Sequence, residues 1–338
     1  MTCTTHLSDR SKMDPTDIRP RLLSSLMYNL LVRTVRLQRY TLTEPWWSWL
    51  WHTTSHLISC PVMTKIHGRT VRLNYGNTYP VNCRLFQSLN SPIVELVYQS
   101  YTTLGSPIVF VDIGAAIGDT LLLLEQRGPR MIERFYCIDG DPEFFRYLRH
   151  NLRDLANGTL LFALLSSHSG TIPELVRIHP GTASAQGKAS APATTLDALL
   201  LPQQLSRLDV LKIDVDGYDG KVLRGATTVL RTFRPAVVFE WHPIACQQTL
   251  NPWTDHFEAL GACGYSIYLW FTKFGHFSHF MIGFEKAAVD ALAELCLRNV
   301  HTDDWHYDVI ALHSTSALSH MALAELAFAK TTSQRGAS

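Results

Sequence analysis

The hydrophobic pattern divides the chain near residue 105. Downstream, short runs of β-branched and aromatic residues alternate with segments in which apolar residues recur at helical spacing. The runs that have the length and composition of strands are 108–112, 135–139, 160–165, 208–214, 236–243, 264–271 and 308–313. This alternation predicts an α/β fold with a doubly wound, mostly parallel, seven-stranded sheet over residues 105–315.

The segments on either side of this core follow other patterns. Residues 1–17 are small and polar, and we expect a disordered tail there. Residues 18–104 are expected to form an α-rich N-terminal extension, with an amphipathic helix near its start and a hairpin within 62–90. Residues 316–338 are expected to form a C-terminal helix and tail.

Half of the eight tryptophans lie in the segment Trp46–Trp51. Such a cluster indicates a helix that packs its aromatic side chains on the core, a membrane-interface anchor, or a platform for a sugar. Packing on the core is the commonest use of so dense a cluster and is the favoured interpretation. Peripheral membrane contact through Trp46–Trp51 stays open as the alternative.

Composition narrows the classes of protein that remain. A formal net charge of +1 gives no reason to expect nucleic acid as a partner. The seven cysteines are widely spaced without a C-x-x-C pair, which indicates reduced thiols rather than a disulfide or zinc framework. The sequence lacks an apolar run long enough for a transmembrane helix and an apolar stretch near its start, so we expect a cytoplasmic protein without a signal peptide.

The first core strand leads into a glycine turn and then a helix. Gly114 and Gly118 carry no side chain, so a ligand can approach the backbone closely between them. Their spacing is G-x-x-x-G and differs from the dinucleotide-binding pattern G-x-G-x-x-G. This difference argues against a nicotinamide-dependent oxidoreductase.

Four carboxylates close consecutive predicted strands at their C-terminal ends: Asp112, Asp139, Asp214 and Glu240. In doubly wound sheets, ligands bind outside these strand ends, where the strand order reverses. A single acid at such a place often caps the next helix, but four in succession favour a binding site. A carboxylate-lined site suits a cationic or polyhydroxylated ligand.

Several ordered motifs carry a family resemblance over roughly residues 105–275. They are Val-Asp-Ile-Gly-Ala-Ala-Ile-Gly at 111–118, Asp139 with Pro142, Thr-Thr-Leu-Asp at 194–197, Leu-Lys-Ile-Asp-Val-Asp-Gly at 211–217, Val-Leu-Arg-Gly-Ala at 222–226 and Phe-Glu-Trp at 239–241. Together they resemble the FkbM family of methyltransferases that use S-adenosylmethionine (AdoMet). The resemblance implies a Rossmann-like class I methyltransferase fold and O-methylation, often of a hydroxyl on a sugar or another natural product. Asp139 and Asp216 depart from the family pattern, which usually has Glu at both positions.

The resemblance implies an AdoMet site at the glycine turn and the strand ends. The expected cofactor-binding residues are Asp112, Gly114, Ala115, Ala116, Gly118, Asp119, Thr120, Asp139, Gly140, Ser166 and Asp214. Asp139 is expected to bind the ribose hydroxyls, and Asp112 to lie near the ammonium group. Because the first and fourth strands are neighbours in this topology, Asp112 and Asp214 should face each other, with the cofactor or Lys212 supplying the balancing charge.

The candidates for catalysis lie at the ends of the fourth and fifth strands. A general base is needed for the acceptor hydroxyl, and Asp214, Asp216, Glu240 and His242 are the candidates, of which Asp216 and His242 are favoured. These side chains could instead bind Mg²⁺. Three parts of the chain are expected to shape the acceptor pocket: residues 166–193, which form a loop or a flap with a short hairpin, the segment 243–256, and the N-terminal hundred residues.

The expected function is therefore AdoMet-dependent O-methylation of a sugar, a glycan or another natural product. Two alternatives remain open: a non-catalytic interaction module with the same fold, and an NAD-dependent oxidoreductase. The sequence does not identify the acceptor or the oligomeric state.

Overall fold

A computed structural model describes residues 18–39, 43–299, 305–318 and 320–327 of the chain. The expected disordered tail at 1–17 lies outside these ranges, as do residues 328–338 of the expected C-terminal segment.

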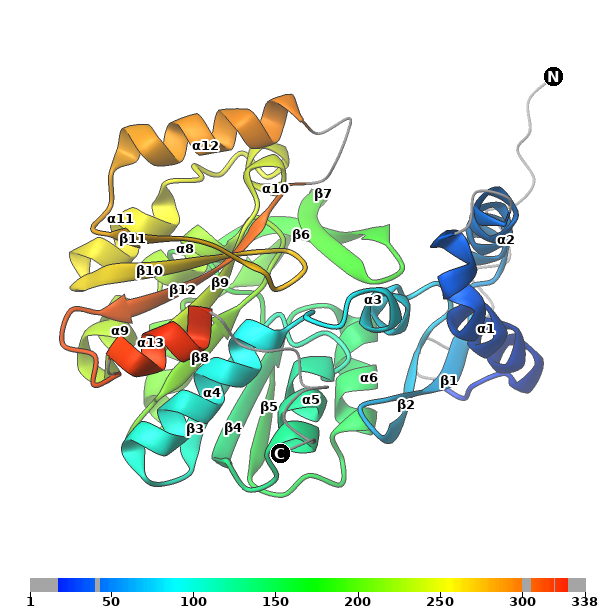
Figure 1. Cartoon of the computed structure of the whole chain (residues 1–338), viewed down its shortest axis with the longest axis horizontal. Helices are drawn as coiled ribbons and strands as arrows, with labels where there is room; N and C mark the ends of the chain where they lie inside the picture. Colours follow the sequence, from blue (N-terminus) through cyan, green and yellow to red (C-terminus); the bar gives the residue numbers. More distant parts are fainter. Residues whose placement is uncertain (1–17, 40–42, 300–304, 319, 328–338) are drawn as a thin grey trace.

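Eight strands form the central sheet, in the order β11-β10-β12-β9-β8-β3-β4-β5 (Figure 1). Their bounds are β3 (Ile108–Ile113), β4 (Ile132–Asp139), β5 (Gly158–Phe162), β8 (Val210–Ile213), β9 (Ala236–Trp241), β10 (Tyr265–Thr272), β11 (Phe277–Ile282) and β12 (Tyr307–His313). The α/β class and all seven predicted strands are confirmed, and β5, β4, β3, β8 and β9 run parallel. The edge strand β11 is additional to the prediction; it pairs antiparallel with β10 after a tight turn at Gly275.

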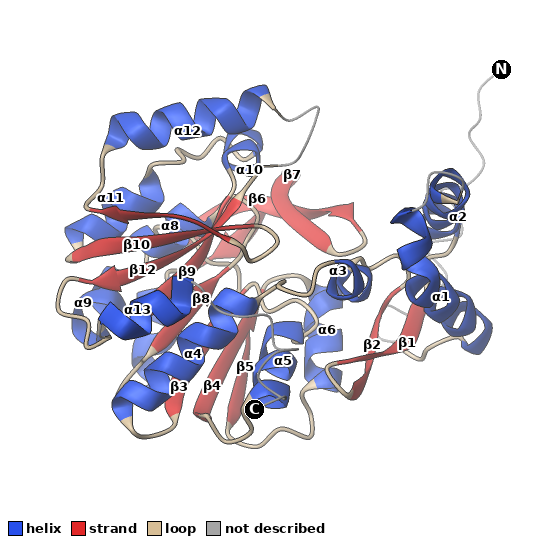
Figure 2. Ribbon diagram, in the orientation of Figure 1, coloured by secondary structure: helices blue, strands red, loops and turns tan. Residues whose placement is uncertain are grey.

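Helices cover both faces of this sheet (Figure 2). One face carries α4 (Ser91–Leu104), α5 (Asp119–Arg127), α6 (Pro142–Asn151) and α13 (His320–Ala327). The other carries α7 (Leu196–Leu200), α8 (Asp219–Arg224), α9 (Thr227–Phe233), α11 (Asp255–Ala262) and α12 (Lys286–Arg298). Along β3, Phe110 enters the first core while Val109 and Val111 enter the second. Burial on both faces explains why the strand is a continuous apolar run.

The N-terminal extension lies beside the α5–α6 side of the sheet (Figure 1). It consists of α1 (Leu22–Thr34), η2 (Val35–Arg39), α2 (Glu44–Leu57), β1 (Pro61–Ile66), β2 (Arg69–Asn74) and α3 (Tyr79–Leu85). The hairpin expected within 62–90 is β1–β2, and it ends earlier because α3 follows. The side chain of Asn151 in α6 bonds both the N–H and the carbonyl of Arg72, at 2.8 and 2.9 Å, and so joins the extension to the core.

The tryptophan cluster is divided between the core and the surface. Trp47 is buried and stacks on the partly buried Trp51, with 5.3 Å between ring centroids. Trp46 and Trp49 are 74% and 61% exposed. Core packing therefore accounts for only half of the cluster. Within the described ranges, every helix is too short or too polar to cross a bilayer.

The segment at 166–193 forms a longer hairpin than expected. Its strands are β6 (Gly170–His179) and β7 (Thr182–Ala193), which pair antiparallel and form a separate two-stranded sheet. The Asn74 side chain donates a hydrogen bond to the carbonyl of Pro180 at the tip of this hairpin. The N-terminal extension and the hairpin therefore contact each other.

Candidate active site

A cavity of about 620 Å³ opens at the carboxyl ends of the parallel strands. β3 lies between β4 and β8 in the sheet, so the chain turns in opposite directions on the two sides of β3. This is the switch point where ligands bind in doubly wound sheets. The cavity is also lined by the β6–β7 hairpin, by residues 77–90 of the extension and by the β10–β11 turn.

The glycine turn brings the backbone to the cavity. Gly114 has φ +76°, and a Cβ atom there would lie 1.8 Å from the carbonyl oxygen of Asp214. Ala116 also has a positive φ, +44°, which costs a non-glycine residue about 1–2 kcal/mol. Its N–H donates to Asp139 Oδ2 at 2.8 Å. The turn is therefore held in a strained, closely packed form that exposes backbone to the cavity.

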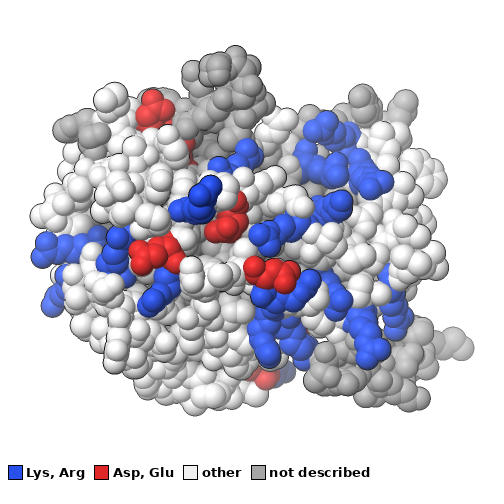
Figure 3. All heavy atoms as spheres, turned by 90° about the horizontal axis from the view of Figure 1, so that it is seen from below, with Lys and Arg blue, Asp and Glu red and all other residues white. Residues whose placement is uncertain are grey.

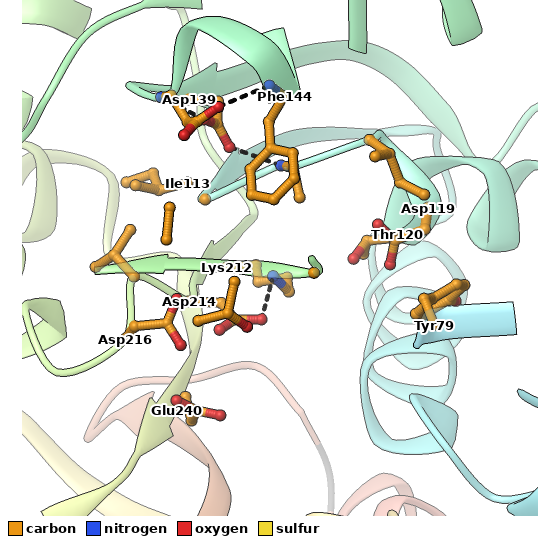
Figure 4. A pocket seen from close by; sticks show the side chains of 18 of the residues that line it. Tyr79, Ile113, Asp119, Thr120, Asp139, Phe144, Lys212, Asp214, Asp216 and Glu240 are labelled. Atoms are coloured by element: carbon orange, nitrogen blue, oxygen red, sulfur yellow. Dashed lines mark hydrogen bonds and ion pairs between the residues drawn. The ribbon is translucent and has the colours of Figure 1, made fainter. Parts of the chain in front are cut away.

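Asp139 ties β4 to this turn (Figure 4). Its second oxygen, Oδ1, accepts a hydrogen bond from the N–H of Asp141 at 2.8 Å. Burial raises the pKa of Asp139 to about 7, against the opposing effect of the two backbone hydrogen bonds. Each oxygen keeps lone-pair capacity for a further donor. Asp139 therefore serves the turn and lines the cavity as well.

The expected pairing of Asp112 with Asp214 is mediated by a lysine. Lys212 Nζ lies 3.3 Å from Asp112 Oδ1 and 3.1 Å from Asp214 Oδ2 (Figure 4 shows the Asp214 contact). Burial alone would lower the pKa of Lys212, but Asp112, Asp214 and Asp119 raise it above its ordinary value. Asp112 is fully buried and does not line the cavity; it acts through Lys212.

Asp216 and Glu240 lie together at the ends of β8 and β9 (Figure 4). Asp216 adopts φ +50° in the turn after β8. Its pKa is raised well above the ordinary value by burial and by the neighbouring charges of Asp214 and Asp219. Burial, Asp214 and Asp216 raise the pKa of Glu240 in the same way. The protonated form of both side chains is therefore favoured in the ligand-free protein.

Two lining residues on β12 and just before it escape the sequence analysis. His306 Nε2 lies 3.5 Å from Glu240 Oε1, and Asp308 pairs with Glu240 across β9 and β12. Burial raises the pKa of Asp308 to about 6. Because β12 is antiparallel to β9, its beginning lies at the carboxyl edge of the sheet. Asp308 begins the last predicted strand. Had that strand been predicted to run antiparallel to its neighbour, Asp308 would have been placed at the carboxyl edge with the other acids.

Asp141, Phe144 and Arg177 form a second group that the motifs do not reveal. Asp141 caps α6 through the N–H groups of Glu143 and Phe144, both at 2.9 Å. Arg177 Nη2 from the hairpin lies 3.0 Å from both Asp141 oxygens, and its guanidinium lies 3.9 Å above the Phe144 ring. These contacts hold the hairpin against the start of α6. Asp141 and Phe144 line the cavity.

The structure brings most of the expected site residues to the cavity. Those that line it are Gly114, Ala116, Asp119, Thr120, Asp139, Gly140, Asp214, Asp216 and Glu240. Among the described residues, Asp112, Ala115, Gly118, Ser166 and His242 are not in the lining. Gly118 precedes α5 with φ +85°, and Ser166 is buried with its N–H on the Thr194 carbonyl.

His242 has a structural setting outside the cavity. Its Nδ1 accepts a hydrogen bond from the N–H of Ala245 at 3.4 Å and caps α10 (Pro243–Gln248). Its ring stacks on His306, with 4.7 Å between centroids. A catalytic role for His242 stays a prediction, and the position of the ring makes contact with a substrate less direct than for Asp216.

A metal at this site also stays a prediction. Across the described ranges, no three His, Cys, Asp or Glu side chains are arranged to hold a metal ion. Among the described residues there is therefore no preformed set of ligands that favours the Mg²⁺ alternative.

Residues 112–267 match the family model described as the methyltransferase FkbM domain. No curated protein matches the chain. Among solved structures, methyltransferase FkbM from Methylobacillus flagellatus KT is 16% identical with a TM-score of 0.39, and the match covers 61% of this chain. The match spans only 43% of that protein.

Two further solved structures are similar at the same low level. M. jannaschii TYW2 in complex with AdoMet is 13% identical with a TM-score of 0.35, over 74% of this chain and 84% of that one. The plantazolicin methyltransferase BamL, in complex with a triazolic desmethylPZN analog and SAH, is 12% identical with a TM-score of 0.35, over 68% and 86%. The family match and the strand order confirm the predicted class I methyltransferase fold.

Proposed function

Residues 112–267 form a methyltransferase FkbM domain, and we propose that this chain is an AdoMet-dependent O-methyltransferase that modifies a hydroxyl of a sugar, a glycan or another natural product. The observation that carries the proposal is the charge of the cavity at the strand ends. The carboxylates that line it are Asp119, Asp139, Asp141, Asp214, Asp216, Glu240 and Asp308, against two lysines, Lys212 and Lys273.

The lining fits a cationic cofactor. AdoMet has a sulfonium and an ammonium group, and opposite charge stabilises carboxylates that burial otherwise drives towards protonation. Burial raises the pKa of Asp119 and Asp139 to about 7 each. Glu240 Oε2 is buried without a hydrogen-bond partner. Such a set of acids is costly in the ligand-free protein and is relieved by a positively charged ligand.

Each part of the cofactor has candidate partners among the lining residues. Asp139 would bind the ribose hydroxyls through its free lone pairs, and the 114–116 backbone would lie against the methionine part. Asp119 and Asp214 supply charge for the ammonium group. When bound, AdoMet supplies an electrophilic methyl group. The protein's own contribution is to hold the acceptor hydroxyl in line and to keep water out.

Asp216 and Glu240 are the groups placed to take the proton of the acceptor hydroxyl. Burial and neighbouring carboxylates raise the pKa of both groups in the ligand-free protein, and the positive charge of bound AdoMet would oppose that effect and leave a carboxylate able to accept the proton. Asp216 adopts a left-handed turn conformation that aspartate and asparagine tolerate better than most residues. The Asp216→Asn variant therefore removes the base with little change in the fold.

The part of the cavity lined by residues 77–90 and the β10–β11 turn suits a polyhydroxylated acceptor. Amide side chains of Asn77, Asn82 and Asn90 line it and can both donate and accept hydrogen bonds. Phe86 and Phe274 also line it and stack with 4.1 Å between centroids. Amides beside an aromatic surface suit a sugar, which presents hydroxyls and apolar C–H faces.

We expect S-adenosylhomocysteine to raise the melting temperature of the protein. At a hundredfold its Kd, a ligand adds about 2.7 kcal/mol to the free energy of unfolding, which corresponds to a shift of a few degrees. NAD serves as the control in the same thermal-unfolding measurement. A shift with NAD alone would favour the oxidoreductase, and no shift with either ligand would favour the non-catalytic module.

The Asp216→Asn variant should retain the S-adenosylhomocysteine shift and lose about 10²–10⁴-fold in turnover, because only the base is removed. The matched variant Asp139→Asn should lose the shift instead, since Asp139 lines the site and orders the glycine turn. Isothermal titration with S-adenosylhomocysteine and methyl transfer to an accepted substrate measure the two effects. Full turnover in Asp216→Asn would remove Asp216 from the mechanism.

A further inference from the structure

The α1–α2 pair presents apolar side chains to solvent. In α1, Leu22, Leu26 and Leu30 recur every four residues and therefore share one face of the helix, and each is more than half exposed. In α2, the exposed apolar residues are Trp46, Trp49, Leu50 and Leu57. We call Leu22, Leu26, Leu30, Trp46, Trp49 and Leu57 the N-terminal apolar face. Large exposed apolar groups of this kind mark interaction surfaces.

The packing of α2 on α1 accounts for this exposure. Trp47 donates a hydrogen bond from Nε1 to the Leu31 carbonyl at 3.2 Å, and Trp51 packs on Tyr28 with 5.9 Å between centroids. The inner tryptophans thus anchor α2 to α1, and helical geometry then directs Trp46 and Trp49 outward. α1 and α2 stand at the end of the molecule away from the sheet (Figure 1), so both remain accessible.

The charge around this face is mostly positive. Residues 18–76 contain eight of the chain's 30 Lys and Arg residues and one of its 29 Asp and Glu residues, Glu44. Arg33 is exposed one helical turn after Leu30, Arg36 is exposed in η2, and Lys65 is exposed on β1 beside the half-exposed Met63. β1 is bonded to α1 through Asn29 and the Met63 carbonyl. Figure 3 shows Lys and Arg spread over the end of the molecule that these elements occupy, with few acids among them.

We propose that the N-terminal apolar face docks on the surface of an anionic lipid bilayer. Leucines and tryptophans can enter the headgroup boundary, where tryptophan is favoured, while the arginines and Lys65 bind anionic headgroups. A second copy of the chain is a poorer occupant, because it would bring the same positive charge to the contact. In the part of the chain that the structure describes, neither α1 nor α2 is long and apolar enough to cross the bilayer, and the contact that we propose is with its surface.

Co-sedimentation with vesicles tests this proposal on the full chain. The protein should sediment with vesicles of equal parts phosphatidylcholine and phosphatidylglycerol, and much less with phosphatidylcholine alone. Raising the salt concentration should weaken the binding, because the headgroup attraction is screened. Equal binding to both vesicle types, or to neither, would overturn the proposal.

Paired variants locate the binding surface. Trp46→Ser/Trp49→Ser and Arg33→Gln/Arg36→Gln should each lower the partition coefficient by about tenfold or more. The matched controls are Leu250→Ser, which removes a side chain that is 89% exposed elsewhere, and Arg298→Gln on α12. The controls should bind like the parent. All six substitutions in these four variants are at exposed positions, and thermal unfolding verifies that each variant is folded.

Two results would contradict the docking assignment. One is a tryptophan variant that binds anionic vesicles as tightly as the parent. The other is a concentration-dependent dimer, seen by analytical ultracentrifugation without vesicle binding, that the tryptophan variant abolishes. That result would assign the face to contact between two copies of the chain.

Discussion

Replacing Gly114 with alanine is expected to lower the free energy of unfolding by about 3–5 kcal/mol and to abolish cofactor binding. The residue has φ +76°, which disfavours any side chain, and the added Cβ would lie 1.8 Å from the Asp214 carbonyl oxygen. That oxygen belongs to the backbone at the end of β8, so it cannot rotate away. The turn and the strand must separate, and the cavity opens between them.

Gly105 provides the matched control for this variant. It has φ +65°, close to that of Gly114, and a Cβ there would meet nothing within 4 Å. Gly105→Ala should therefore cost only the conformational strain, about 1 kcal/mol. Chemical denaturation of both variants and titration with S-adenosylhomocysteine measure the difference. Equal losses in the two variants would show that the close approach of β3 and β8 at Gly114 is unimportant.

The strands were predictable because burial on both faces leaves a continuous apolar run, as in β3. β11 has no such run: its residues alternate between half-buried and exposed at the edge of the sheet. The hairpin at 170–193 was underestimated for a related reason. Its Ser, Gly, Pro and Ala residues are typical of loops, and the strands are stabilised by contacts with Asn74 and α6 and by a small apolar cluster in which Ile172 and Ala185 pack with Tyr218.

The lining of the cavity was predictable where an acid stands at the carboxyl end of a parallel strand. Asp139, Asp214 and Glu240 line the cavity because the sheet brings its carboxyl ends together. Asp308 and Arg177 could not be placed this way, since one enters through an antiparallel strand and the other through a hairpin far along the chain. Sequence position also cannot distinguish a side chain that lines the cavity from one that only contacts a lining residue.

Asp112 shows this limit: it is the penultimate residue of β3, as Asp139 is the last residue of β4, yet it is fully buried and contacts Lys212 instead of lining the cavity. Asp112 and Lys212 are better described as one electrostatic unit beneath the cavity. Neither Asp112 oxygen has a hydrogen-bond partner, so the lysine supplies its only opposite charge within the described contacts. Removing that charge should have a large effect.

The Lys212→Met variant is expected to lose about 3–5 kcal/mol of stability at neutral pH, because it leaves a buried carboxylate uncompensated. Lys286→Met, which breaks an exposed pair with Asp290 on α12, should cost at most about 1 kcal/mol. The double variant Asp112→Asn/Lys212→Met should recover much of the loss, since the unpaired charge is gone. Urea denaturation of the three variants and the parent measures these differences.

The pH dependence of the stability of Lys212→Met tests the charge of Lys212 in a second, independent way. Burial and the Asp214 charge raise the pKa of Asp112, and loss of Lys212 removes the main opposing effect. The folded variant then holds a proton on Asp112 more tightly than the unfolded chain does, so its stability falls as pH rises through the range between the two pKa values. The deficit relative to the parent should therefore be smaller at pH 5 than at pH 8. A deficit that is constant with pH, or one that Asp112→Asn fails to reduce, would show that Lys212 stabilises the site through packing rather than charge.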